Sequence, residues 1–342
     1  MTAAYYTGQG GLEFRPCKPR KPEPSEVRIE VAYAGVCGSD LSIYRGHRDE
    51  RMCLPTIIGH EMSGTLVEVG TEVVEWQPGD RVVVLPYTTC GSCRACEQGH
   101  DHICYNMEFF GVETSGAFQN SWTVPAHTLH RLPPTMPLDL AALVEPVSVA
   151  MHAVRVSELT PGDFAVVLGG GPIGLLTALV ASYRGARVLL SELNPFRVDF
   201  IRQIGMEVVD PTQVDLPKVV QQATAGGGAD MVFEVSGSQV AASGMSELLG
   251  SRGLALVVAV FGEPSRINLK SFFMRELRLQ AVRGYRHEDF DDAIDLVASG
   301  KYPFERVITG RVPVPELAGV FEQMESGAPV MKTLLQLGET GS

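Results

Sequence analysis

Residues 165–174 read Ala-Val-Val-Leu-Gly-Gly-Gly-Pro-Ile-Gly, and this stretch decides the fold. An apolar run of strand length, Ala165–Leu168, leads into glycines spaced as G-x-G-x-x-G, and an apolar helix-like segment follows. Glycines in such a strand–turn–helix unit permit a tight turn and let the backbone approach a pyrophosphate at the helix N-terminus. The predicted dinucleotide contacts in the turn are Gly169, Gly171, Pro172, Ile173 and Gly174.

Apolar strand-like runs alternate with helix-like stretches on both sides of this turn. Such alternation is typical of βαβ units, so we expect an α/β domain with a doubly wound parallel sheet. The alternative for the turn is a plain glycine-rich loop in such a domain. The further expected strands are Arg187–Ser191, Met231–Val235, Leu254–Val260 and Leu277–Val282, and the expected helices are Ile173–Tyr183, Pro195–Ile204 and Gln239–Leu249.

Glu192 ends the second expected strand, about 20 residues after the glycines, where dinucleotide sites place an acid that binds the ribose hydroxyls. A carboxylate there repels a 2′-phosphate, which favours NAD over NADP. Arg197 points the other way, because a nearby Arg can accommodate that phosphate. The predicted cofactor contacts outside the glycine turn are Glu192, Arg197 and Ala259.

The first 140 residues contain short strand-like runs broken by Gly and Pro, at Val27–Tyr33, Thr65–Val69 and Arg81–Leu85. They predict an antiparallel β-rich domain. Arg15–Pro24 carries four prolines and should be extended. After Arg286 we expect an amphipathic helix over His287–Ser299 and then mixed short elements.

The composition excludes several partners. Hydrophobic content of 45% and charged content of 20% indicate an ordinary globular protein, and the net charge of −12 argues against nucleic acid and, mildly, against an anionic membrane surface. The N-terminus lacks a secretory signal pattern, and the most apolar stretch, Ile173–Val180, is too short to span a bilayer. We therefore expect a cytoplasmic protein with no membrane or nucleic-acid partner.

Four of the seven cysteines, Cys90, Cys93, Cys96 and Cys104, fall within fifteen positions. This spacing lets one loop wrap a tetrahedral ion in four thiolates, the closed arrangement of a structural zinc site. Disulfides or unrelated thiols are the alternative, but clustered thiols in a reducing cytoplasm favour metal ligation. A closed tetrathiolate has no open position, so the chemistry must lie elsewhere.

Cys37, His60 and the carboxylates Glu61 and Glu145 are candidate ligands of a second, catalytic zinc, because such a set leaves a position open for water or substrate. Zinc would polarise an alcohol oxygen and lower its pKa, so that an alkoxide can expel hydride. Asp40 should accept the ring N–H of His60. Taken alone, His60 would be a surface histidine or a hydrogen-bonded core histidine, and Cys37 a small buried hydrophobe.

The stretch Gly59–Val73, Gly-His-Glu-Met-Ser-Gly-Thr-Leu-Val-Glu-Val-Gly-Thr-Glu-Val, closely resembles the zinc signature of the zinc-dependent medium-chain dehydrogenase/reductase superfamily, and the four-cysteine loop resembles its structural-zinc lobe. The similarity runs from about residue 5 to residue 337. It implies a GroES-like catalytic domain over 1–146 with the lobe at 90–104, a Rossmann NAD-binding domain over 147–284 and a C-terminal return over 285–342. Zinc, NAD and substrate would share a cleft between the domains.

Residues 145–153, Glu-Pro-Val-Ser-Val-Ala-Met-His-Ala, resemble the sorbitol, threonine and sugar-acid dehydrogenase branch. The branch implies Cys37, His60 and a carboxylate on zinc, with Glu61 and Glu145 able to exchange with water. Ser39 matches the hydroxyl that accepts the alcohol proton. The turn after Ser191 and the later Arg197 match NAD-using sorbitol dehydrogenases.

Two positions depart from the pattern. Many members have a His where this chain has Ser42, so His47 or water must complete the proton exit. Arg283 is shifted by one from the arginine of sorbitol dehydrogenases and is more like that of sugar-acid dehydrogenases. It either binds a substrate carboxylate or is a solvated Arg at a strand end. The predicted substrate contacts are Ile43, Trp122 and Arg283.

These features together predict an NAD-dependent zinc dehydrogenase of a secondary alcohol in a polyol, sugar acid or cyclitol. The alternatives are an NADP-preferring ketoreductase of small ketones or diols and a non-catalytic zinc- and nucleotide-binding protein. We expect one catalytic and one structural zinc per chain. Pairing of Leu277–Val282 across a two-fold axis, and the family resemblance, predict a homodimer or homotetramer.

Overall fold

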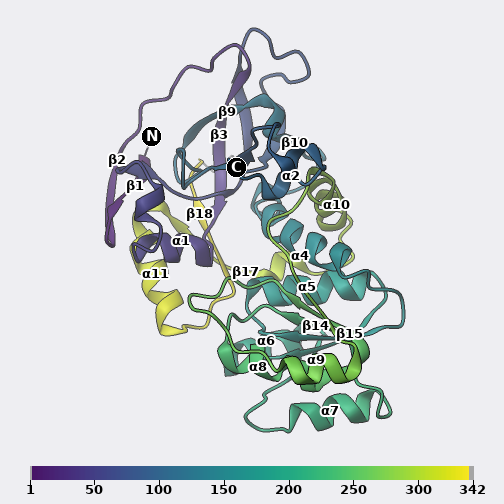
Figure 1. The fold of residues 1–342 in the computed structure, drawn as a ribbon. Helices are drawn as coiled ribbons and strands as arrows, with labels where there is room; N and C mark the ends of the chain where they lie inside the picture. The colour runs from purple at the N-terminus through teal and green to yellow at the C-terminus, as the bar shows by residue number, and fades with distance from the viewer. Residues whose placement is uncertain (1, 339–342) are drawn as a thin grey trace. The chain divides into compact units, whose positions relative to one another are not determined.

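The computed structural model describes residues 2–338. The chain forms two compact units, whose course is followed by colour in Figure 1. The first unit combines the described residues of Met1–Glu145 and Arg286–Ser342, and the second is Pro146–Tyr285. The chain therefore leaves the first unit once, builds the second and returns. The predicted domain limits stay predictions.

The second unit is built on a six-stranded parallel sheet in the order β13-β12-β11-β14-β15-β16. All five residues of β11 are buried, as expected for a parallel strand covered on both faces. The direction of strand addition reverses beside β11, and ligands of doubly wound sheets bind at the carboxyl ends of strands there. The strands are β11 (Phe164–Leu168), β12 (Arg187–Ser191), β13 (Glu207–Val209), β14 (Ala229–Glu234), β15 (Leu249–Val257) and β16 (Arg278–Ala281).

Helices connect these strands, which confirms the α/β fold class predicted from the alternation. β13 was not predicted, because it has only three residues, of which one is buried. The helices are α5 (Pro172–Tyr183), α6 (Pro195–Gln203), α7 (Leu216–Ala223), α8 (Gln239–Leu248) and α9 (Leu269–Arg275). Residues from the strands and from α7, α8 and α9 form the core of this unit.

The first unit is built on a mostly antiparallel sheet in the order β10-β6-β5-β3-β18-β17, with β9 also paired to β3. The C-terminal strand β18 lies between β3 and β17, so the returning segment completes a sheet that the N-terminal part begins. The strands are β3 (Glu26–Gly35), β5 (Glu61–Val69), β6 (Arg81–Val84), β9 (Ser121–Pro125), β10 (Leu129–Arg131), β17 (Ile308–Pro313) and β18 (Lys332–Gln336).

Smaller elements surround this sheet. A second sheet joins β1 (Thr2–Gly8), β2 (Gly11–Pro16) and β4 (Thr56–Ile57), and β7 (Tyr87–Thr88) pairs with β8 (Glu108–Phe109). Among residues 2–338, no helix combines the length and apolar character that crossing a membrane requires. The helices with residues in this unit are α1 (Gly38–Tyr44), α2 (Arg94–Glu97), α3 (Leu138–Ala141), α4 (Val144–Val156), α10 (His287–Ala298) and α11 (Leu317–Ser326).

Candidate catalytic metal centre and cofactor site

Two neighbouring strands of the first unit position Cys37, His60 and Glu61. Cys37 follows the end of β3 and is the N-cap of α1, whereas Glu61 is the first residue of β5. The two strands pair so that Gly35 is opposite Glu61. A Cβ at Gly35 would lie 2.0 Å from a carboxylate oxygen of Glu61. The missing side chain at Gly35 therefore makes room for the carboxylate.

The side chains of Cys37, His60 and Glu61 converge, and one donor atom from each lies within 4.8 Å of the others. The Ser39 hydroxyl oxygen lies 3.2 Å from Nε2 of His60. On the other side of the ring, Nδ1 lies 3.3 Å from a carboxylate oxygen of buried Asp40, an ion-pair contact without an aligned hydrogen bond. The second Asp40 oxygen accepts the backbone N–H of Cys37 at 2.8 Å. Asp40 thus holds both Cys37 and His60.

This donor set fits a zinc ion. A thiolate, an imidazole and a carboxylate are all zinc ligands, and three protein ligands leave one position open. A carboxylate on Nδ1 orients the ring and leaves Nε2 for the metal. Burial alone would lower the pKa of His60, but the charge of Asp40 and then Cys37 raise it well above its usual value. A metal ion that binds Nε2 must therefore displace a proton from the His60 ring.

Lys332 is a member of the centre that the sequence did not reveal. Its Nζ lies 2.7 Å from each oxygen of Glu61 and donates to the carbonyl oxygen of Val36 at 3.1 Å. Burial would lower the pKa of Lys332, yet the charge of Glu61 raises it above its usual value. A lone Lys in the apolar run Val330–Leu335 is the signal that could have drawn attention to it, because lysines are almost never fully buried unless paired.

Glu145, the other predicted carboxylate ligand, is buried and lies close enough to Lys332 for its charge to act on that ammonium. It is not among the donor atoms that meet within 4.8 Å. Its role as a ligand stays a prediction, as do the roles of Ser39 and Asp40 in catalysis.

The four cysteines of the lobe at 90–104 come together around one point. Their sulfur atoms lie 3.5 Å apart for Cys93 and Cys96, 3.9 Å for Cys93 and Cys104, and 3.5 Å for Cys90 and Cys104. A zinc–sulfur bond of about 2.3 Å gives a tetrahedron with edges of about 3.8 Å. The observed separations match that edge, so the lobe fits a tetrathiolate zinc site.

The lobe thiols differ in acidity. The backbone N–H of Ser92 lowers the pKa of Cys90 to about 5. Desolvation raises the pKa of Cys96 to about 12. Because zinc binds all four as thiolates, metal binding must release protons here too.

In the second unit, the predicted glycine turn joins β11 to α5, and Gly171 is the N-cap of the helix. Gly169 has a φ of 106°, which favours glycine. A Cβ at Gly174 would lie 1.9 Å from the carbonyl oxygen of Gly169, so this glycine allows the close helix–strand packing of dinucleotide sites. Pro172 and Ile173 are the first two residues of α5.

Glu192 directly follows β12 and is buried beside the turn. Its carboxylate accepts the backbone N–H groups of Gly170 at 2.7 Å, Leu193 at 2.7 Å and Asn194 at 2.8 Å. Arg197, near the start of α6, lies 3.8 Å from the same carboxylate. Ala259 follows β15, and its N–H donates to the Glu234 carbonyl oxygen at 3.1 Å. The acid and its neighbouring Arg therefore form one charged pair at the turn.

The predicted substrate residues lie in different environments. Ile43 and Trp122 belong to the hydrophobic core of the first unit, and the Trp122 ring N–H donates to the Ser115 carbonyl oxygen at 2.9 Å. Arg283 is exposed, follows β16, and has no hydrogen bond or ion pair with any residue in the range 2–338. Contact of these three residues with a substrate stays a prediction.

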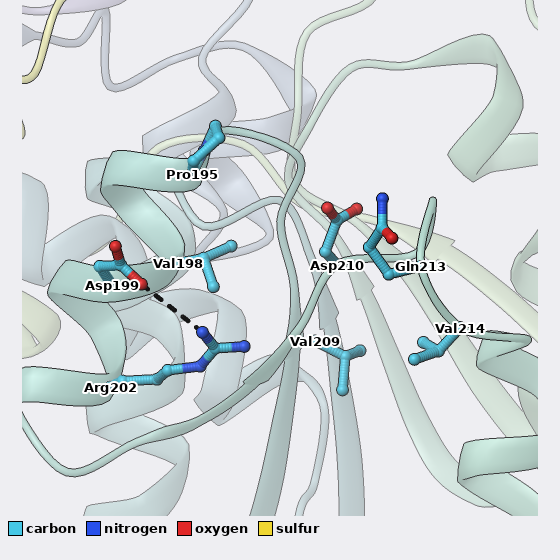
Figure 2. Close-up of a pocket in the computed structure, with 8 residues that line it drawn as sticks. All are labelled: Pro195, Val198, Asp199, Arg202, Val209, Asp210, Gln213 and Val214. Atoms are coloured by element: carbon cyan, nitrogen blue, oxygen red, sulfur yellow. Dashed lines mark ion pairs between the residues drawn. The ribbon is translucent and has the colours of Figure 1, made fainter.

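A surface hollow in the second unit lies outside this site. It is lined by α6, the end of β13 and the loop that follows, and Figure 2 shows the ion pair of Asp199 and Arg202 on its α6 side. Their charged atoms are 3.5 Å apart, and both side chains are exposed, so the pair contributes little. None of the predicted cofactor residues lines this hollow.

The chain matches two protein families. Residues 23–134 match the alcohol dehydrogenase GroES-like domain, and residues 172–299 match the zinc-binding dehydrogenase family. The first match covers Cys37, His60, Glu61 and the cysteine lobe, and the second begins in the glycine turn.

Individual proteins resemble the chain over nearly its whole length. The 2-dehydro-3-deoxy-L-galactonate 5-dehydrogenase of Pseudoalteromonas atlantica is 44% identical over 336 residues, 98% of each chain. The sorbitol dehydrogenase of Halalkalibacterium halodurans is 32% identical over 92% of this chain and 94% of its own. The structure of a zinc-binding dehydrogenase from Sinorhizobium meliloti bound to NADP superposes with a TM-score of 0.91 at 28% identity and 98% coverage of each chain.

Proposed function

Because the chain belongs to the zinc-binding alcohol dehydrogenase family, in the branch of sorbitol and sugar-acid dehydrogenases, we propose that it oxidises a secondary alcohol of a sugar acid with NAD⁺. The products are a ketone, NADH and a proton, and the reaction is reversible. The observation that carries the proposal is the convergence of Cys37, His60 and Glu61 beside the Ser39 hydroxyl. The relative with 44% identity makes the 5-hydroxyl of a 2-dehydro-3-deoxyaldonate the first candidate.

Each residue of the centre would have a separate role in the reaction. Cys37, His60 and a carboxylate would hold a zinc ion, which supplies Lewis-acid polarisation of the alcohol oxygen. The Ser39 hydroxyl would accept the alcohol proton, which its distance of 3.2 Å from Nε2 of His60 supports. Asp40 keeps the His60 ring oriented and its Nε2 available. The cysteine lobe would hold a second zinc that only stabilises its loop.

Glu192 supports NAD as the cofactor. Its carboxylate stands where the ribose hydroxyls bind, and it would repel a 2′-phosphate. The alternative is an NADP-preferring reductase of small ketones or diols, favoured by Arg197 beside Glu192 and by the NADP-bound relative. Arg197 is already within 3.8 Å of Glu192, so its charge is partly compensated.

Arg283 supports a sugar acid over a neutral polyol or cyclitol. It emerges at the carboxyl end of β16, the sheet edge at which ligands of doubly wound folds bind. Its guanidinium is exposed and unpaired within residues 2–338, and it suits a carboxylate better than Lys does.

The protein would be a cytoplasmic homodimer or homotetramer. β16 is an edge strand whose four residues are all exposed, and the nearby α9 exposes Phe273 and Met274. An unpaired edge with apolar neighbours favours pairing with a second copy. Light scattering should therefore give a mass above that of one chain, and a purely monomeric species would reject this part.

A NAD⁺-reduction screen tests the proposal. It would cover 2-dehydro-3-deoxyaldonates, aldonates, polyols, cyclitols and small diols, each with NAD⁺ and NADP⁺. We expect the largest kcat/KM for a sugar acid with NAD⁺. A clear preference for a neutral diol with NADP⁺ would establish the alternative, and no turnover of any alcohol by zinc-loaded protein would overturn both.

A further inference from the structure

All three N–H donors of the Lys332 ammonium have acceptors inside the catalytic centre. It faces both oxygens of Glu61 at 2.7 Å and the carbonyl oxygen of Val36 at 3.1 Å, which accounts for the three N–H donors of a lysine. The side chains of Lys332 and Glu61 are 3% and 0% exposed, so the pair is shielded from bulk solvent.

The sheet fixes where this ammonium lies. β18 pairs with β3 so that Leu334 is opposite Gly35, and the N–H of Val36 donates to the Thr333 carbonyl oxygen at 3.0 Å. Lys332 is two residues before Leu334 and therefore points to the same face of the sheet. Its ammonium therefore contacts both Val36, which directly precedes Cys37, and Glu61, the first residue of β5.

A buried pair of this kind is not explained by stability alone. Removing two charges from water costs several kcal/mol each, and an apolar pair of similar volume is often at least as stable. Glu61 is, however, one of the donors that converge with Cys37 and His60. An ammonium on both of its oxygens offsets its charge and competes with a cation for its lone pairs.

The pair of Lys332 and Glu61 also affects the charge balance of the metal centre. The Cys37 thiolate and the carboxylates of Asp40, Glu61 and Glu145 would carry four negative charges against the two positive charges of a divalent ion, and Lys332 offsets one of the two in excess. With Glu61 neutralised in this way, the ion keeps an open position, which an additional carboxylate would otherwise fill.

We propose that Lys332 is a positioning residue that keeps Glu61 beside the catalytic metal but off its coordination sphere at rest. The proposal rests on the metal site of the proposed function and on none of its substrate or cofactor assignments. Loss of the ammonium should let Glu61 bind the ion permanently and close the position that substrate needs.

Cobalt substitution tests this without any substrate. Cobalt(II) at the centre reports its ligands through the d–d absorption, and subtracting the spectrum of His60→Ala removes the contribution of the cysteine lobe. In Lys332→Met we expect an altered d–d spectrum and release of metal to a chelator slowed on the order of 10-fold, the scale on which partners of metal ligands act. Lys332→Arg should keep the wild-type spectrum.

The double variant Lys332→Met/Glu61→Gln separates positioning from folding. It should recover the wild-type spectrum and release rate, because the amide no longer binds the ion as a carboxylate does. An unchanged cobalt spectrum in Lys332→Met, with only a lower thermal stability, would overturn the proposal. If Lys332→Met does not fold, the cobalt spectrum of Glu61→Gln is the deciding measurement. A spectrum unchanged from wild type supports the proposal. An altered spectrum shows that Glu61 is a ligand of the resting metal and overturns the proposal. A failed substrate screen would leave these readouts intact.

Discussion

The Ser42 hydroxyl oxygen lies 3.5 Å from Nδ1 of His47, one turn of chain beyond the end of α1. The resemblance to the family places Ser42 where many members have a histidine, and His47 is exposed. A hydroxyl and an imidazole in contact can pass a proton to solvent as one histidine would. His47 is therefore the candidate exit for the proton that Ser39 is proposed to accept.

We expect His47→Ala to lower kcat and to make it depend on buffer concentration, because buffer molecules must then take the proton directly. Added imidazole should restore part of the rate. Ser42→His in the same background should remove the buffer dependence. A His47→Ala enzyme with wild-type kcat in dilute buffer would exclude His47 from the exit route.

Cys93→Ser should remove the structural metal. We expect zinc content to fall from about two to about one per chain and thermal stability to drop, because a structural zinc organises its loop. Cys53→Ser is the matched control, since Cys53 is an exposed free thiol outside the lobe. Unchanged zinc content and melting temperature in Cys93→Ser would remove the lobe from the list of zinc sites.

Features of the fold and the site that depend on neighbouring residues could be predicted from the sequence, whereas contacts between residues far apart in the chain could not. The glycine turn at 169–174 and the cysteine lobe are local patterns: the turn joins β11 to α5, and the four cysteine side chains converge. The contact of Lys332 with Glu61 joins residues 271 positions apart, and it exists only because β18 returns to pair with β3. No periodicity or spacing encodes such a contact.

Burial of single side chains was equally inaccessible. Ile43 and Trp122 belong to the hydrophobic core because β9 pairs with β3 and α1 packs against the same unit, which no local sequence pattern reveals. β13 is too short for its alternation to be detected.

Metal binding at the catalytic centre should weaken as the pH falls. Asp40 and Cys37 raise the pKa of His60 above its usual value, so the metal-free protein keeps this ring protonated to a higher pH than an ordinary His. Zinc binds the neutral ring, so protonation of His60 below its raised pKa lowers the affinity of the centre for zinc. Zinc competition titrations across pH, with proton release followed by calorimetry, measure this. In Asp40→Asn the loss of zinc affinity caused by protonation of His60 should begin at a lower pH; an unmoved profile would show that Asp40 does not raise the pKa of His60.

Glu192→Ala should reduce the preference for NAD over NADP. Loss of a hydrogen bond to a charged group costs about 1.5–3 kcal/mol, which lowers the kcat/KM ratio of the two cofactors by on the order of 10- to 100-fold. Arg197→Ala should lower whatever activity NADP supports and leave NAD largely unaffected. If Glu192→Ala keeps the wild-type ratio, the carboxylate does not select the cofactor.

Arg283→Ala should raise KM for a sugar acid if the guanidinium binds the substrate carboxylate in a desolvated pair. The expected loss of binding free energy is about 2–3 kcal/mol. A neutral polyol should be affected little, and Arg283→Lys should recover only part of the loss, because Lys cannot make the bidentate contact. Equal losses on acid and polyol would leave the carboxylate contact without support.

The most direct test compares wild type and Cys37→Ala for NADH formation from 2-dehydro-3-deoxy-L-galactonate, with zinc content and circular dichroism measured on the same samples. We expect wild type to reduce NAD⁺, and Cys37→Ala to stay folded, keep the lobe zinc and show no turnover. A folded Cys37→Ala protein that has lost one zinc and still turns over at the wild-type rate would contradict a catalytic metal held by Cys37 and His60.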